Sequence, residues 1–180
     1  MEVYRPVALA VCLLFDRRSD SAIRAIWDRL ESDGVPTLRS HTHGHHVPHL
    51  SLAVLRSWDA SAVAGALGRL PAGPAVQLQF DGVGLFRRGR VWLVAGVSAA
   101  LVARQERVVE AVTATGADLH KHYRPGIWTP HCSVAPRAML AQLPTVAAAL
   151  YDVLPLRATL DRAALVDSAT GVITPLARMP

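Results

Sequence analysis

The sequence predicts an α/β or α+β fold in which helices pack on a β-sheet, and two observations carry that prediction. Strand-like and helix-like segments alternate along the 180 residues, and no linker or low-complexity stretch separates them. A six-residue motif occurs twice, as Pro-His-Leu-Ser-Leu-Ala at 48–53 and as Pro-His-Cys-Ser-Val-Ala at 130–135. Each copy follows a helix and a polar loop and precedes another helix, so we expect one domain, 1–180, made of two similar, intertwined lobes.

The chain opens with a buried strand and an amphipathic helix. Val7–Phe15 is an apolar run, which predicts a strand buried on both faces. A polar residue among 19–21 can cap the following helix, and Gly34 ends it. The apolar residues that recur at the spacing of one helix face are Ile23, Ile26, Trp27 and Leu30.

A polar loop rich in histidine spans 35–48 and leads into a strand at His49–Leu55. Asp59 or Ser61 can begin the next helix, which continues to Leu70 before a segment rich in proline and glycine.

The remaining elements continue the alternation. Strands are predicted at Val76–Phe80 and Val91–Val97, joined by a Gly- and Arg-rich connection, and a helix follows at about 99–114. The second motif predicts a strand at His131–Ala135, with a helix at Met139–Leu150 despite an internal proline. The last three predicted strands are Leu156–Leu160, Ala163–Asp167 and Val172–Leu176.

Composition narrows the class of protein. Hydrophobic residues make up 51% and charged residues 18%, which excludes a disordered chain. The net charge of +5 favours anionic ligands such as phosphates or nucleic acid. The two cysteines form neither a disulfide framework nor a zinc-binding spacing. The apolar run at 7–15 is too short to cross a bilayer, and its flanks do not suit a signal peptide, so we expect a cytoplasmic protein without a membrane partner.

Strand geometry places the polar residues of each motif on one face. His49 and Ser51 alternate with leucines, and His131 and Ser133 alternate with Cys132 and a valine. If a pseudo-two-fold axis relates the strands, two imidazoles and two hydroxyls converge on one cleft. Such a set suits phosphoryl transfer to water without a metal. A neutral imidazole takes a proton from water, an imidazolium protonates the leaving alkoxide, and the hydroxyls hold the phosphoryl oxygens.

With these residues the chain resembles the 2H phosphoesterase superfamily, and within it the 2′-5′ RNA ligase-like (RNA 2′,3′-cyclic phosphodiesterase) group. The family signature is two His-h-(Ser/Thr)-h motifs, in which h is apolar, and it is matched at 49–52 and 131–134. The resemblance implies a bilobal α+β fold with two pseudo-symmetric antiparallel sheets lining a central groove and helices outside. It also implies cleavage of phosphodiester bonds, 2′,3′-cyclic phosphate or 2′-5′ linkages, in nucleotides or RNA ends.

Carried over residue by residue, the resemblance makes His49 and His131 the acid/base pair, and Ser51 and Ser133 the phosphate-binding residues. Cys132 then occupies the family's variable apolar position and has no catalytic role. We expect a monomer that needs no cofactor.

Further residues can reach the substrate. Tyr123, Arg124 and Trp128 precede the second motif and can stack a base and grip a phosphate, with core or rim packing as the alternative. Tyr4 and Arg5 open the first strand and can reach the rim of the cleft. The basic hairpin tip at 87–90 reads as a solvated turn, with RNA backbone contact as the alternative.

Five of the eight histidines lie between His41 and His49, and alternating histidines in a loop can chelate a transition metal. No carboxylate or cysteine completes the set, so we assign no metal site. Two alternatives to the cyclic phosphodiesterase therefore remain: a non-catalytic module that binds a nucleotide or RNA end, and a metal-binding hydrolase that uses the His41–His49 cluster.

Overall fold

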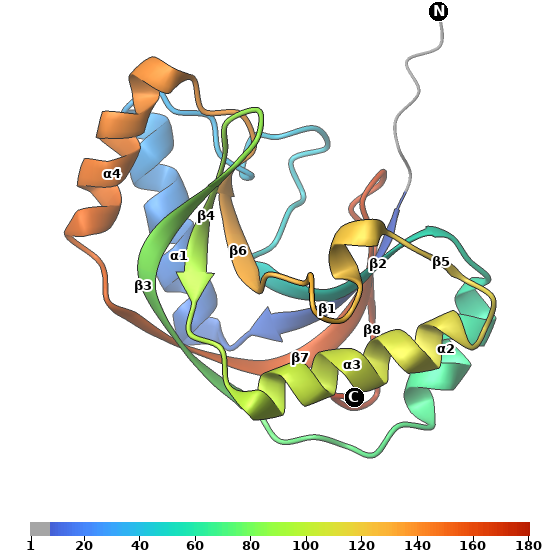
Figure 1. Ribbon diagram of the computed structural model, residues 1–180. Helices are drawn as coiled ribbons and strands as arrows, with labels where there is room; N and C mark the ends of the chain where they lie inside the picture. The colour runs from blue at the N-terminus through green and yellow to red at the C-terminus, as the bar shows by residue number, and fades with distance from the viewer. Residues whose placement is uncertain (1–7) are drawn as a thin grey trace, which may run out of the picture.

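The computed structural model describes residues 8–180, so the predicted start of the first strand at Val7 lies outside the described residues. The fold is α+β, as predicted, with helices packed outside an antiparallel sheet (Figure 1). The strands are β1 Leu9–Phe15, β2 His49–Ser57, β3 Val76–Phe86, β4 Arg90–Ala95, β5 Asp118–Leu119, β6 His131–Ala135, β7 Leu156–Asp167 and β8 Ile173–Pro175. The helices are α1 Arg17–Ser32, α2 Ala60–Gly68, α3 Ala99–Thr113 and α4 Leu143–Tyr151, with 3₁₀ turns η1 Lys121–Tyr123 and η2 Leu140–Gln142.

The order of elements repeats. The first half runs β1–α1–β2–α2–β3, and the second runs β4–α3–β6–α4–β7, with the short elements β5, η1 and η2 added. Helix α1 packs with α4, and α2 packs with α3, so each half contributes one helix to each pair. In Figure 1 the α1–α4 pair lies at the left of the view and the α2–α3 pair at the lower right. The motif strands β2 and β6 hold equivalent positions in the two halves.

The two halves share one continuous sheet, in which the strand order is β5-β2-β1-β7-β3-β4-β6 and β8 pairs with β7. The resemblance implied two sheets, and β7 is the strand that joins them. Its first residues, Leu156–Leu160, pair with β3, and the segment from Leu160 to Asp167 pairs with β1. The two strands predicted in this region are therefore one strand of 12 residues. Although β2 and β6 lie toward opposite ends of this strand order, they contact each other, so the sheet curves back on itself.

Several element boundaries differ from the prediction for local reasons. Helix α1 begins at Arg17 because Asp16 is its cap, accepting a hydrogen bond from the amide of Ser19. Helix α4 begins only at Leu143, with its proline in the first turn, where a missing amide hydrogen costs nothing. Strand β3 continues through the glycines to Phe86 and pairs with β4 along its second half.

The core lies between the sheet and the helices. The predicted apolar face of α1 is confirmed, since Ile23, Ile26, Trp27 and Leu30 are all buried. In β2, Leu50 and Leu52 are fully buried. Within residues 8–180, no helix combines the length and apolar character needed to cross a membrane.

Candidate active site

The first motif lies on β2, beside β1. His49 pairs with Leu14 and Ser51 pairs with Cys12, so these four side chains occupy one face of the sheet. His49 is half-buried, whereas Ser51 has only 8% of its surface exposed. The hydroxyl of Ser51 lies 3.5 Å from the Cys12 sulfur. The first motif therefore presents a half-buried imidazole next to a deeply set hydroxyl.

The second motif lies on β6, beside β4, in the equivalent arrangement. His131 pairs with Val94 and Ser133 pairs with Trp92, while Cys132 faces the core and is fully buried. Both His131 and Ser133 are half-buried. The alternation predicted from the sequence is thus present in both strands.

The two imidazoles are held by matching hydrogen bonds. Nδ1 of His49 lies 2.8 Å from the carbonyl oxygen of Val47, and Nδ1 of His131 lies 2.7 Å from the carbonyl oxygen of Thr129. A carbonyl oxygen only accepts, so Nδ1 carries a proton in both rings. In a neutral ring Nε2 is then the unprotonated nitrogen, free to accept a proton from a ligand. In a charged ring Nε2 carries the proton that can be donated.

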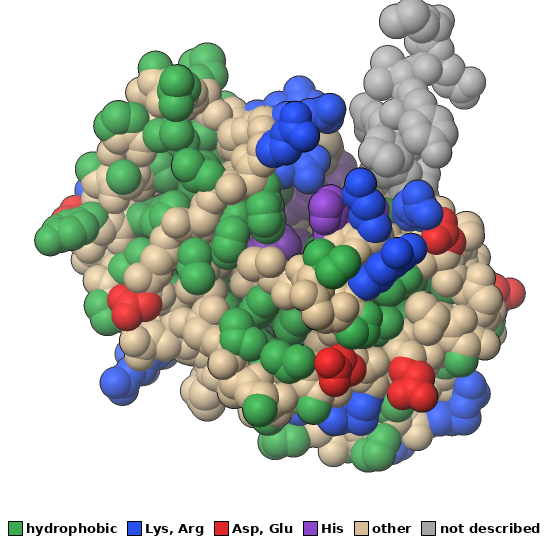
Figure 2. Space-filling model, in the orientation of Figure 1, with side chains coloured by type: hydrophobic (Ala, Val, Ile, Leu, Met, Phe, Trp, Pro, Cys, Tyr) green, Lys and Arg blue, Asp and Glu red, His purple; other side chains and the backbone are tan. Residues whose placement is uncertain are grey.

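The structure brings the two histidines together. The charge of His49 lowers the pKa of His131, and the His49 backbone lies close enough to the Cys132 thiol to act on its pKa. Figure 2 shows histidine side chains in a hollow of the surface, with Lys and Arg side chains along two of its sides. We call this hollow the groove.

Both imidazoles are poorer proton binders than a free histidine. Burial is the main cause that lowers the pKa of His49 below its ordinary value, and the bond to Val47 opposes it. Burial also lowers the pKa of His131, the bond to Thr129 opposes it, and the charges of His49 and Arg90 lower it further. A ligand that carries negative charge would reverse these effects, because an anion favours the imidazolium form.

Trp128 and Tyr123, two aromatic residues predicted to bind substrate, contact the first motif. Nε1 of Trp128 donates a hydrogen bond to the carbonyl oxygen of Ser51, 3.0 Å away. Nε2 of Gln105, which is buried, donates to the carbonyl oxygens of Leu52 and Tyr123. Burial raises the pKa of Tyr123 to about 12, and the adjacent Ser51 hydroxyl opposes the rise. These contacts favour the packing alternative for Tyr123 and Trp128, in which they fix the position of β2.

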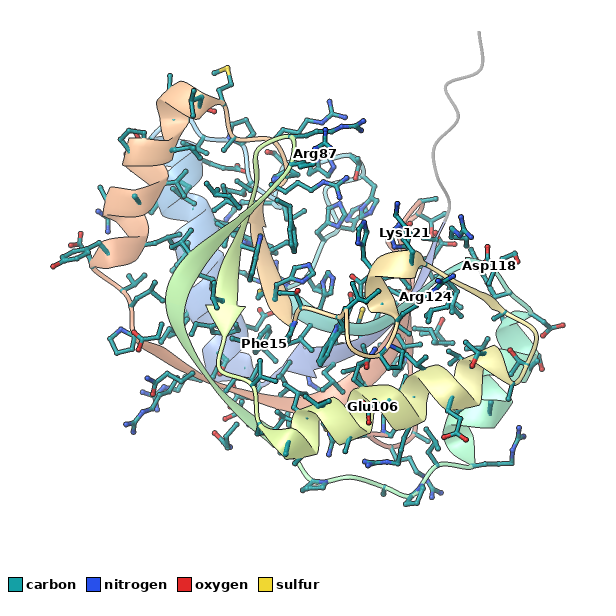
Figure 3. The ribbon with its side chains drawn as sticks, in the orientation of Figure 1. Phe15, Arg87, Glu106, Asp118, Lys121 and Arg124 are labelled. Carbon is teal, nitrogen blue, oxygen red and sulfur yellow. The ribbon has the colours of Figure 1, made fainter. Side chains whose placement is uncertain are left out.

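Basic side chains border the groove from two elements. Figure 3 shows Arg87 at the tip of the β3–β4 hairpin, and Lys121 and Arg124 across from it on the segment that contains η1. Arg124 is exposed, so this predicted residue remains accessible to a ligand. Tyr4 and Arg5, the other predicted rim residues, lie outside the described residues.

Arg90 is a groove residue that the sequence did not single out from its hairpin. Its charge lowers the pKa of His131 on β6, of His120 beside η1, and of His41 in the loop before β2. The charge of Arg90 therefore acts on histidines of three separate segments. Alternation along β4 predicts that Arg90, Trp92 and Val94 share one face of the strand. Only the register with β6 shows that this face adjoins His131 and Ser133.

The histidine-rich loop stacks its rings on one another. The ring centroids of His43 and His46 are 4.1 Å apart, and those of His41 and His46 are 5.7 Å apart. Burial lowers the pKa of His46 to about 4, with further lowering by the charges of His43, His41 and His49. Among residues 8–180, no three His, Cys, Asp or Glu side chains are arranged to hold a metal ion.

The two cysteines are buried thiols. Burial raises the pKa of Cys12 and that of Cys132 to about 12, so both stay protonated and unreactive near neutral pH. This agrees with the apolar role that the family resemblance implied for Cys132.

Comparisons with known proteins identify the family and the fold. The family model described as the 2′-5′ RNA ligase superfamily matches residues 18–171. Escherichia coli LigT in complex with 3′-AMP is similar at 19% identity, with 97% of each chain covered and a TM-score of 0.64. A crystal structure described as a phosphoesterase is similar at 18% identity, with 97% of each chain covered and a TM-score of 0.62.

Usb1 of Kluyveromyces marxianus is similar at 13% identity, covering 97% of this chain and 100% of its own, with a TM-score of 0.50. No curated protein sequence matches the chain. The structural likenesses show the shared fold, and the family model covers both motif strands. The chain belongs to the 2′-5′ RNA ligase superfamily of 2H phosphoesterases.

Proposed function

We propose that this protein is a metal-independent phosphodiesterase that hydrolyses 2′,3′-cyclic phosphates or 2′-5′ phosphodiester bonds of nucleotides or RNA ends. The observation that carries the proposal is the matched pair of Nδ1 hydrogen bonds, 2.8 Å at His49 and 2.7 Å at His131. These bonds leave both Nε2 atoms to exchange protons with a ligand in the groove. Hydrolysis of a phosphodiester is accelerated when a general base activates water and a general acid protonates the leaving oxygen, and two such rings can supply both groups.

In the proposed step, Nε2 of the neutral histidine takes a proton from water as the water oxygen bonds to phosphorus. The bond from phosphorus to the leaving ribose oxygen breaks, and Nε2 of the other, charged histidine protonates that oxygen. The products are a phosphomonoester and a free hydroxyl, and the pair ends with its proton on the opposite ring. Ser133, Ser51 and Arg90 are proposed to hold the non-bridging oxygens as charge moves onto them.

The chemistry of a known ligand of the fold is consistent with this proposal. LigT has been crystallised with 3′-AMP. A 3′-phosphate is the product formed when the 2′ bond of a 2′,3′-cyclic phosphate is hydrolysed. The pH behaviour expected of the groove also fits, since an anionic substrate raises the pKa of both histidines and promotes the charged form that the acid needs.

The test is turnover of 2′,3′-cyclic mononucleotides, oligonucleotides that end in a cyclic phosphate, and 2′-5′ and 3′-5′ dinucleotides, each with and without EDTA. We expect cleavage of a cyclic phosphate or of a 2′-5′ bond that EDTA does not affect, and its loss in His49→Gln and in His131→Gln. Binding without turnover would make the protein a nucleotide-binding module. Loss of activity with EDTA that added zinc restores would favour the metal alternative.

A further inference from the structure

Two aromatic side chains from β3 and β4 surround His131. The rings of Phe86 and Trp92 are stacked, with centroids 4.7 Å apart and an angle of 23° between their planes. Each meets the His131 ring edge-on, with centroids 5.1 Å away for Phe86 and 5.6 Å away for Trp92. The aromatic pair thus belongs to the groove beside the second histidine.

The register of the strands explains why Trp92 lies flat. Trp92 pairs with Gly84 on one side and with Ser133 on the other. A Cβ atom at position 84 would lie 2.2 Å from the Trp92 ring, so the indole occupies the space that the glycine leaves open. Trp92 is buried there, with 8% of its surface exposed, and its ring packs against one face of the Phe86 ring.

Phe86 remains accessible on top of this support. It is 38% exposed, so a ligand in the groove can reach the ring beside His131. Its partner across the hairpin is Arg90, whose charge acts on His131. An apolar ring, a guanidinium and an imidazole therefore lie together, and this set matches the base and the phosphate of one nucleotide.

We propose that Phe86, supported by Trp92, is the platform on which the nucleobase of the substrate stacks, and that Phe86 sets how strongly the protein prefers a nucleotide to a phosphodiester without a base. This inference rests on the proposed function. Tyr123 and Trp128 contact Ser51 of the first motif, so we assign the stacking role to Phe86 and not to them. Stacking uses the face of a base and not its edges, so larger purines bind more tightly than pyrimidines without a strict base requirement.

Steady-state kinetics on two substrates test the platform. One substrate is 2′,3′-cyclic AMP, and the other is methyl riboside 2,3-cyclic phosphate, which has no base. Phe86→Ala should raise KM for 2′,3′-cyclic AMP by about 5- to 150-fold, the range of losses that alanine substitution of a base-stacking ring produces. For the baseless substrate the same variant should change KM far less than it does for 2′,3′-cyclic AMP, and Phe86→Tyr should retain the wild-type KM for both substrates. Leu85→Ala, in the same hairpin and 55% exposed, is the matched control.

Calorimetric titration separates failure of the platform from failure of the proposed function. Phe86→Ala should weaken binding of 3′-AMP by the same factor and leave binding of inorganic phosphate unchanged, whether or not the wild-type protein turns over a cyclic phosphate. Equal losses for 3′-AMP and phosphate would assign Phe86 to the support of His131, and no loss for either would remove it from the site. Either result overturns the inference, as does a wild-type protein that binds 3′-AMP no more tightly than phosphate.

Discussion

His49 and His131 donate their Nδ1 protons to carbonyl oxygens at the same offset, each two residues earlier in the chain, at 2.8 and 2.7 Å. Equal tautomers make the two rings interchangeable in principle as acid and base. What distinguishes them is their surroundings. The charge of Arg90 lowers the pKa of His131, whereas burial lowers that of His49 and the bond to Val47 opposes it. Among the described residues, the effect of Arg90 on His131 therefore has no counterpart beside His49.

The first prediction concerns the loss of either ring. His49→Gln and His131→Gln should each lower kcat/KM on a cyclic phosphate by about 10²–10⁴-fold, because each removes one proton transfer. The double variant should be little worse than either single variant, since acid and base act as a unit. Circular dichroism should confirm that all three variants fold. Additive losses in the double variant would contradict a coupled pair.

The second prediction is the pH dependence of kcat/KM. Burial lowers the pKa of both histidines, and the charge of one lowers that of the other, so the pair has two separated apparent values. The singly protonated form is most abundant between them, which places the optimum on the acid side of about pH 6.5, the ordinary histidine value. The optimum of kcat should lie at higher pH, because bound phosphate raises both pKa values. A kcat/KM optimum above about pH 6.5 would contradict the acid/base roles of His49 and His131.

Arg90→Ala gives the third prediction. Removal of a charge-assisted contact to phosphate should lower kcat/KM by about 10- to 100-fold. Because the charge of Arg90 lowers the pKa of His131, its removal should also raise that pKa and shift the kcat/KM profile toward neutral pH. Arg90→Lys keeps the charge and should shift the profile less. Arg87→Ala, at the tip of the same hairpin, is the control and should leave the profile in place.

The fourth prediction compares the two hydroxyls. Ser133 is half-buried, so Ser133→Ala should lower kcat by up to about 10²–10³-fold, as loss of one preorganised donor does, with little change in Tm. Ser51 is buried and lies 3.5 Å from the Cys12 sulfur, so Ser51→Ala should lower Tm as well as kcat. Thermal unfolding measured beside kinetics checks both. Full activity in both variants would remove the phosphate-binding role.

The fifth prediction tests how firmly Trp92 is held, by comparing alanine substitutions at Gly84 and Gly82. Gly84→Ala places a methyl group 2.2 Å from the Trp92 ring and must displace the indole, which we expect to cost about 1–3 kcal/mol in the free energy of unfolding. Gly82→Ala, on the same strand face, would meet the Val94 side chain at 3.6 Å, an ordinary contact. Urea denaturation should therefore separate the two variants. Equal stabilities would show that the indole moves aside freely.

Much of this site follows from the sequence. The two motifs predicted both strands, and the alternation along them predicted which residues share a face, because side chains of a strand alternate whatever the strand packs against. The structure agrees for His131–Ala135 to the residue and for the start of β2 at His49. The apolar face of α1 was equally predictable, since helical spacing is a local property.

Only the tertiary structure decided which residues adjoin the motifs. The register of β4 against β3 and β6 places Trp92 between Gly84 and Ser133, and it brings Phe86 and Arg90 beside His131. Likewise, β7 is one strand because its two ends pair with different partners, β3 and β1. Local alternation determines the face of a side chain but not its neighbour across the sheet, since pairing between distant strands is set by the packing of the whole chain.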